Sequence, residues 1–192
     1  NMNHFGEIGS SGGGINMLSN NMLGRSDFFT GAFPAEYGNA LSGVFDINLR
    51  TGNNEKHEQT FQIGIIGTEL MAEGPLNRQT GATYIAQFRF YTLGLVTAVG
   101  LMDHTPDFMD LSFKFHLPSR RMGTFSVFGI GGKSHEKGES GYDWYNDNAT
   151  LGVSNVIGVS ESTRIKTIAA LSLWKYRWDT QRDIGSPANP ID

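Results

Sequence analysis

The sequence predicts an all-β protein whose strands are antiparallel and apolar on one face. Three observations support this fold class: the composition, a repeating period of two from about residue 43, and the lengths of the connections between the repeats. The 192 residues include 25 glycines, 13 phenylalanines, six tyrosines and three tryptophans, and only 18% of them are charged. Many glycines and aromatic residues with few charges are typical of a twisted sheet.

The bulk numbers also exclude several classes of protein. A net charge of −4 argues against a nucleic-acid partner, because phosphate binding needs clustered Lys and Arg, and the densest basic spot is only "PSRR" at 118–121. The chain has no cysteine, which excludes thiol catalysis, disulfides and thiolate metal sites. No run of about 18 apolar residues is present, so no transmembrane helix is predicted.

Residues 1–27 are rich in Gly, Ser and Asn and contain "GSSGGG" at 9–14. Such a composition is typical of a flexible linker. Apolar residues are interleaved, however, including Met17, Leu18 and Met22, and a linker does not need them. We therefore expect an irregular segment that packs against something else. The start of the chain has no basic and apolar signal region, so it is either mature or cut from a longer precursor, and we favour the second.

From about residue 43 apolar and polar side chains alternate. We predict a strand at 43–50 and a polar break at 51–58, followed by seven strands. In "DFMDLSFKFHL" at 107–117, from Met109 onward the apolar side chains fall on odd positions and the polar ones on even positions, which only a strand separates onto two faces. The seven strands are predicted at 60–67, 68–76, 82–92, 107–117, 124–132, 149–160 and 163–179.

The connections between these strands alternate between short turns and long loops. Short links are predicted near 67 and at 77–81, 118–123 and 161–162, and long ones at 93–106 and 133–148. An up-and-down barrel with turns at one rim and loops at the other has this pattern. A soluble sandwich with Greek-key links has no reason to have it.

Aromatic residues near the strand ends agree with a membrane barrel. Tyr91 lies at the long-loop end of its strand, and Trp174, Tyr176 and Trp178 lie where the last strand would leave a membrane at the same rim. Amphipathic rings favour the headgroup level, so we interpret them as an aromatic girdle; the alternative is a cross-strand cluster in a soluble sheet. We thus predict part of an antiparallel transmembrane β-barrel, because bacterial barrels have an even number of strands and seven cannot close one.

A family resemblance adds a second part to this prediction. "SDFFTGAFPAEYGNALSGVFDINLRTGN" resembles the end of the plug domain of TonB-dependent outer-membrane receptors. "GTELMAEGPLNRQTGATYIAQFRF" is similar to their first barrel hairpin, and "PDFMDLSFKFHLPSRRMGTFSVFGIGG" to the next hairpin in receptors of the Bacteroidota type. The plug-motif positions are Phe33, Pro34, Glu36, Tyr37, Gly38, Ser42, Gly43 and Arg50.

The resemblance implies two regions: the C-terminal part of a plug domain at 1–54 and the first strands of a 22-stranded barrel at 55–192. It implies a receptor in the outer membrane of a Gram-negative bacterium that takes up a nutrient. The implied partners are outer-membrane lipid, a TonB-type energy-coupling protein, and a surface lipoprotein or other subunits of an outer-membrane complex. Two alternatives stay open: a scaffold barrel that transports nothing, and a soluble β-sandwich binding module.

No catalytic, cofactor or metal site is predicted. The five histidines have no metal-ligand spacing, and "DHTPD" at 103–107 is best interpreted as a solvated loop. "GIGG" at 129–132 is too short for a dinucleotide fingerprint. We therefore do not expect an enzyme.

Two sets of residues are candidates for recognition and for internal contacts. An external loop is predicted to hold a ligand or partner through stacking rings beside Asp and Asn; its residues are Tyr142, Asp143, Trp144, Tyr145, Asn146 and Asp147. Separately, a charge buried between plug and barrel needs a partner. We predict that Arg50 pairs with a barrel acid, either Glu69 or Glu73.

Overall fold

The computed structural model describes residues 3–4, 15–31, 34, 37, 43–64, 67–91, 107–137 and 142–180. Within these residues the chain is all-β apart from one turn of 3₁₀ helix, η1 (Asn20–Met22). Four short strands come first, β1 (Asn3–His4), β2 (Ile15–Asn16), β3 (Asp27–Phe29) and β4 (Val44–Asp46). Seven longer ones follow, β5 (Glu58–Ile63), β6 (Gly67–Asn77), β7 (Ala82–Tyr91), β8 (Asp107–Ser119), β9 (Gly123–Lys137), β10 (Tyr142–Gly158) and β11 (Arg164–Thr180).

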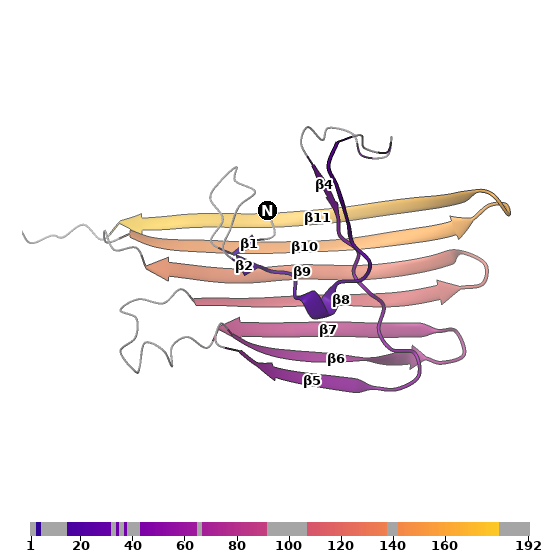
Figure 1. Cartoon of the computed structure of the whole chain (residues 1–192), viewed down its shortest axis with the longest axis horizontal. Coiled ribbons are helices and arrows are strands. Elements are labelled where there is room, and N and C mark those ends of the chain that lie inside the picture. The colour runs from indigo at the N-terminus through magenta and orange to yellow at the C-terminus, as the bar shows by residue number, and fades with distance from the viewer. Residues whose placement is uncertain are drawn as a thin grey trace, which may run out of the picture.

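The seven longer strands form one sheet in chain order, β5 to β11, and every neighbouring pair is antiparallel. Figure 1 shows this meander as long ribbons that lie side by side. The predicted number of strands and their antiparallel pairing are confirmed. The sheet is not closed into a barrel, since β5 and β11 are its two edges.

Tight turns join the strands at one end of the sheet. Between β6 and β7 the Asn77 side chain accepts the N–H groups of Gln79 and Thr80, an Asx turn that reverses the chain. Gly81 and Gly123 begin or precede the returning strands with φ of +76°, a conformation that residues with a Cβ rarely adopt. This end is called the turn rim below, and the opposite end, where β7 and β11 finish, the far rim.

The two faces of the sheet have opposite chemistry. We call the face that contacts residues 16–22 and 49–53 the inward face and the other one the outward face. On β8, Asp110, Ser112 and Lys114 point inward, and residues of the same register on β7 and β9 share that face. The outward face of β8 carries Met109, Leu111, Phe113, Phe115 and Leu117, confirming the predicted alternation.

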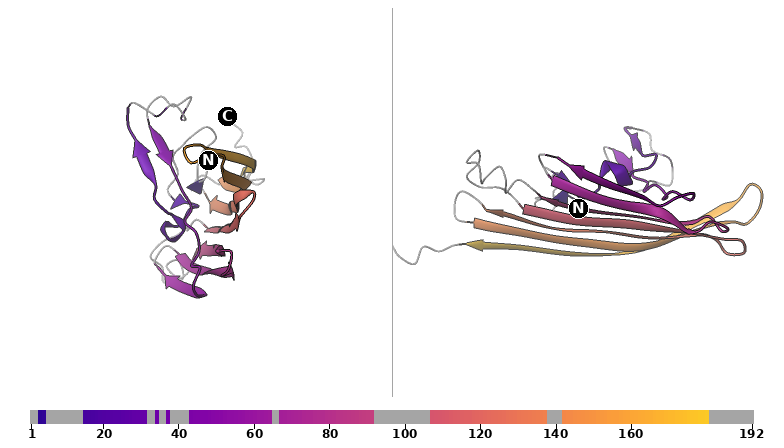
Figure 2. Two further views of the ribbon diagram at one scale, coloured as in Figure 1. Left: turned by 90° about the vertical axis from the view of Figure 1, so that its right-hand side faces the viewer. Right: turned by 90° about the horizontal axis from the view of Figure 1, so that it is seen from below.

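Two stretches of the N-terminal segment, residues 16–22 and 49–53, lie across the inward face, as Figure 2 shows. Met22 is fully buried between this segment and the sheet, where it packs with Met71 of β6 and Ile85 of β7. Met17 and Leu18 pack against Ile130 of β9 in a second small cluster. The prediction that the Gly- and Ser-rich segment packs against another part of the protein is confirmed for Met17, Leu18 and Met22.

Two strand predictions need correction. The strand expected at 43–50 is shorter, since only Val44–Asp46 pairs with β3, and Leu49 makes a single bridge to Leu23. The long loop expected at 133–148 is wrong, because Lys133 to Lys137 belong to β9 and residues from Tyr142 belong to β10. Polar side chains there alternate as in any strand; Ser134 and Asn146 are buried inward, and the ladder between β9 and β10 satisfies the backbone.

Among the described residues before β5, no separately folded domain is evident. They form two short antiparallel pairs and η1; Met17, Leu18 and Met22 pack on the sheet, and no described residue of β3 or β4 belongs to a core cluster. The boundary predicted at residue 54 lies before the start of β5 at Glu58 and stays a prediction.

Candidate functional site

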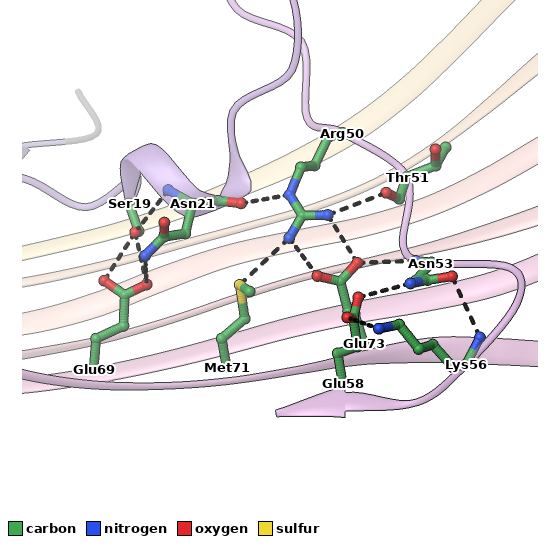
Figure 3. Close-up of polar contacts among 10 residues, drawn as sticks. All are labelled: Ser19, Asn21, Arg50, Thr51, Asn53, Lys56, Glu58, Glu69, Met71 and Glu73. Atoms are coloured by element: carbon green, nitrogen blue, oxygen red, sulfur yellow. Dashed lines mark hydrogen bonds and ion pairs between the residues drawn. The ribbon is translucent and has the colours of Figure 1, made fainter. Parts of the chain in front are cut away.

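The candidate site is a polar seam between the N-terminal segment and the inward face of β6. It consists of Ser19, Asn21, Arg50, Glu69 and Glu73, and Figure 3 shows all five side chains meeting over the sheet. Strand β6 places its two glutamates four residues apart, so both point inward with Met71 between them. Each glutamate is received by a different part of the N-terminal segment.

Glu73 is held by Arg50 through two charge-assisted hydrogen bonds. Arg50 Nη2 lies 2.6 Å from Glu73 Oε1, and Nη1 lies 2.8 Å from Oε2. The backbone N–H of Asn53 donates to Glu73 Oε2 at 2.8 Å. A fork-to-fork pair of this kind is specific in direction as well as strong. The predicted pairing of Arg50 with a barrel acid is confirmed, and the acid is Glu73.

Arg50 is tied to its own segment as well as to the sheet. Its Nε donates to the carbonyl of Asn21 at 2.6 Å, and its backbone N–H donates to the carbonyl of Met22 at 3.0 Å. The hydrogen bond to Glu73 raises the pKa of the Arg50 guanidinium above its ordinary value, so the charge persists throughout the physiological range. Arg50 thus joins η1, its own loop and β6 at one point.

Glu69 takes its partners from η1. Ser19 is the N-cap of η1, and its hydroxyl lies 2.8 Å from both carboxylate oxygens of Glu69 while accepting the N–H of Asn21. Asn21 Nδ2 donates to Glu69 Oε1 at 2.8 Å. Ser19 and Glu69 are 4% and 9% exposed, so these bonds are shielded from water. The sequence analysis did not predict Ser19 or Asn21 as partners of Glu69, because a segment without periodicity does not show which strand it faces. The available signal was Ser19 itself, since serine is a preferred N-cap residue and thus indicates the start of a helical turn.

A second polar group continues the seam toward the far rim. Arg89 of β7 donates through Nε and Nη2 to Asp110 of β8 at 2.9 and 2.7 Å. Arg89 also reaches the carbonyl of Asn16 at 2.5 Å, which binds the N-terminal segment at another point. Gln87 and Ser112 complete the group, since Ser112 donates to Gln87 and Gln87 to Asp110. Gln87, Asp110 and Ser112 are buried although they are polar, and Arg89 is half-buried.

The plug-motif residues are only partly within the described chain. Phe33, Glu36, Gly38 and Ser42 lie outside the described residues. Tyr37 is half-buried beside the ring of Phe29, at 5.5 Å between centroids, and its N–H donates to the carbonyl of Pro34. Gly43 lies against the ring of Phe28, where an added Cβ would be 3.2 Å from a ring carbon. Of this motif, only Arg50 belongs to the seam.

The predicted ligand loop is not a loop and does not form one surface. Its residues are in β10, where Asp143, Tyr145 and Asp147 point outward and Trp144 and Asn146 point inward. Tyr145 is sandwiched between His135, stacked at 4.4 Å, and Arg177, at 4.3 Å. Tyr142 is the first residue of β10. Strand alternation therefore places the other five side chains on two opposite faces, and ligand binding by either set stays a prediction.

The residues predicted to form a membrane girdle lie near the far rim but on the inward face, and their place in a membrane stays a prediction. Trp174, Tyr176 and Trp178 lie near the far rim, but by register they share the inward face with Asn146 and Trp144. Trp174 Nε1 donates to Asn146 at 2.9 Å, and Tyr176 meets Trp144 edge-on at 6.0 Å. Tyr91 also faces inward, with its ring 5.2 Å from the buried Phe108. Side chains alternate along β11, and Leu171 and Leu173 take outward positions, so the even-numbered Trp174, Tyr176 and Trp178 point inward.

The described residues contain no group of three or more acidic or histidine side chains placed to hold a metal ion. Across the same part of the chain, no helix has the length and apolarity needed to cross a membrane. No family model matches the sequence, and neither the curated proteins nor the solved structures provide a significant match.

Proposed function

We propose that this chain is part of an outer-membrane receptor of the TonB-dependent type, in which residues up to about 54 belong to the plug and the sheet belongs to the barrel wall. The observation that carries the proposal is the inversion of the sheet. Its outward face is apolar and exposed, while its inward face is polar and, over β6 to β8, covered. A protein in water has the reverse arrangement, whereas a barrel wall in lipid requires this one.

The dimensions of the apolar face fit a membrane. On β8 it runs from Met109 to Leu117, and on β11 from Ile165 to Leu173, eight residue steps in each strand. At about 3.3 Å per residue this is ~26 Å along the strand. A tilted strand needs about 9–11 residues to span a bilayer, and each of these apolar runs is nine residues long. Lys133, Asp147, Lys175 and Arg177 follow at the far-rim side, where a headgroup region would begin.

The same face argues against a soluble β-sandwich. A sandwich buries the apolar faces of two sheets against each other. In the described chain the outward face has no second sheet over it, and Leu151, Leu171 and Leu173 are 56%, 67% and 65% exposed. An uncovered apolar surface of this extent marks a membrane or a large interface.

The first test is the behaviour of the full-length protein purified from its membrane. We expect it to need detergent, to be several times heavier than 21.1 kDa, and to change its mobility on a gel after heating, as complete barrels do. A native chain of 192 residues that is soluble without detergent would overturn the membrane proposal.

A second test separates a transporter from a scaffold barrel. Energy-gated transport requires the plug to move away from the wall, whereas a scaffold does not. Ser19→Cys introduces a thiol at a site that is 4% exposed, and these 192 residues contain no other cysteine; any cysteines elsewhere in the full-length protein are replaced first. In a transporter, maleimide should label this thiol faster in energised cells than in cells treated with a protonophore. Equal labelling rates would favour the scaffold.

A further inference from the structure

The outward face is not uniformly flat but carries a hollow of about 700 Å³ near the far rim. Its floor lies over β9 and β10, where the outward residues Gly131 and Ala149 have small or no side chains. Met109 and Leu111 of β8 form one wall, and Leu171 and Leu173 of β11 form the other. The hollow is thus lined by hydrocarbon and open to the surroundings of the sheet.

Charged side chains close the hollow only at the far-rim side. Lys133 and Lys175 line that end, and in the register they flank Asp147 from the two neighbouring strands. Two ammonium groups beside one carboxylate leave a net positive charge. One step further along, Arg177 already has a partner, since it pairs with Asp179 at 3.3 Å. The surface therefore changes from apolar to cationic between one outward residue and the next, two positions along each strand.

We infer that this hollow is a binding site for a membrane lipid whose phosphate-bearing headgroup has a net negative charge. An acyl chain would lie in the apolar hollow, and the phosphate would lie between Lys133 and Lys175. Lysine is suited to this role, because its long stem follows apolar surface while the ammonium reaches the headgroup level. Charge complementarity identifies the occupant, since the cation of a zwitterionic headgroup offsets the attraction of its phosphate to the two lysines, whereas a net negative headgroup has no such cation. This inference rests on the proposed membrane location.

The experiment uses the full-length protein in detergent and native mass spectrometry. Phosphatidylglycerol and phosphatidylcholine with identical acyl chains are titrated separately, and we expect the anionic lipid to bind more tightly. A basic residue near an anionic headgroup contributes about a five-fold change in affinity, so Lys133→Gln with Lys175→Gln should weaken phosphatidylglycerol binding about 25-fold. Asp147→Asn should strengthen it about five-fold for the same reason.

A second pair of variants tests the apolar part of the site. Ala149→Leu fills the floor of the hollow and should weaken the binding of both lipids, while the face stays apolar. Ala169→Leu is the matched control, because Ala169 points outward from β11 but does not line the hollow. Lys166→Gln, on the inward face of the same strand, is the control for charge. Both controls should leave the affinities within about two-fold of the original protein.

The outcomes separate this inference from the proposed function. A protein that needs detergent but binds both lipids equally, or whose preference survives loss of both lysines, would overturn the lipid site alone. The appearance of a dimer in place of lipid adducts would also overturn it, since a second copy would then occupy the face. A protein soluble without detergent would overturn the membrane location and the lipid site together.

Discussion

The inward and outward faces of the seven strands are formed by alternate residues of the same strands, yet the ion pairs over β6 and β7 on the inward face are largely buried, whereas the one on the outward face of β11 is exposed. On the inward face, Arg50 and Glu73 are 31% and 7% exposed and form a bidentate pair beneath the N-terminal segment. On the outward face, Arg177 and Asp179 are 53% and 58% exposed and meet at 3.3 Å. The ion pair on the inward face therefore joins the N-terminal segment to β6, whereas the ion pair at the far rim joins two residues of the same strand.

The difference shows how a sheet can be polar inside without being unstable. A carboxylate removed from water is costly unless it is paired and hydrogen-bonded. Glu69, Glu73 and Asp110 all meet this condition, and each receives at least one partner from outside its own strand. The seam therefore holds the segment by specific polar contacts, with only two small apolar clusters beside them.

The largest effect is expected from removing the cation of the seam. Arg50→Ala leaves Glu73 buried with only the Asn53 N–H, and breaking a buried pair costs about 3 kcal/mol. Amide exchange across residues 19–24 should therefore be faster by about 100-fold if that segment opens from the sheet. The double variant Arg50→Ala, Glu73→Leu should recover much of the loss. Unchanged retention of the segment in Arg50→Ala would remove the idea that this pair fastens it.

The next effect tests the outward face directly. Leu171 and Ala170 are neighbours on β11 at the same height, pointing outward and inward respectively. Leu171→Arg should lower the free energy of unfolding from a bilayer by about 2–4 kcal/mol, and Ala170→Arg by much less, because a cation facing mid-bilayer hydrocarbon is costly and one facing a polar lumen is not. Denaturant unfolding from phospholipid vesicles measures both. Equal costs would contradict the assignment of the two faces.

A smaller effect is expected at Glu69. Glu69→Gln keeps an oxygen for Ser19 or Asn21 but removes the charge that strengthens both hydrogen bonds. We expect a loss of about 1 kcal/mol, again read from amide exchange in residues 19–24. Gln62→Ala is the control, because Gln62 contacts Asn21 only at an exposed site and at 3.3 Å. A loss as large as that of Arg50→Ala would place Glu69, rather than Glu73, at the centre of the seam.

The sequence was informative wherever side-chain alternation decided the structure. It predicted seven antiparallel strands, the two faces of β7 and β8, and the pairing of Arg50 with an acid of β6. Each of these follows from local pattern or from the rule that a buried charge needs a partner. Position in the strand was enough, and no register had to be known.

Prediction failed where register or polarity had to be judged across strands. Residues 133–148 were interpreted as a loop because they are polar, but polar residues at the end of a barrel-like strand can still pair. Trp174 was assigned to the lipid side from its height alone, although Leu173 and Lys175 on either side take the outward positions. Ser19 was missed as a partner of Glu69 because fifty residues and no periodicity separate them.

The smallest effect is expected at the far rim. Asp179→Asn removes the exposed partner of Arg177, and exposed ion pairs contribute only about 0–0.5 kcal/mol. Arg177 keeps its place, because its guanidinium lies over the ring of Tyr145 at 4.3 Å. Unfolding from vesicles at low and high salt measures the difference. A loss comparable to that of Arg50→Ala would mean that charge at the rim is covered as it is in the seam, and the contrast between the two faces would then rest on the apolar band alone.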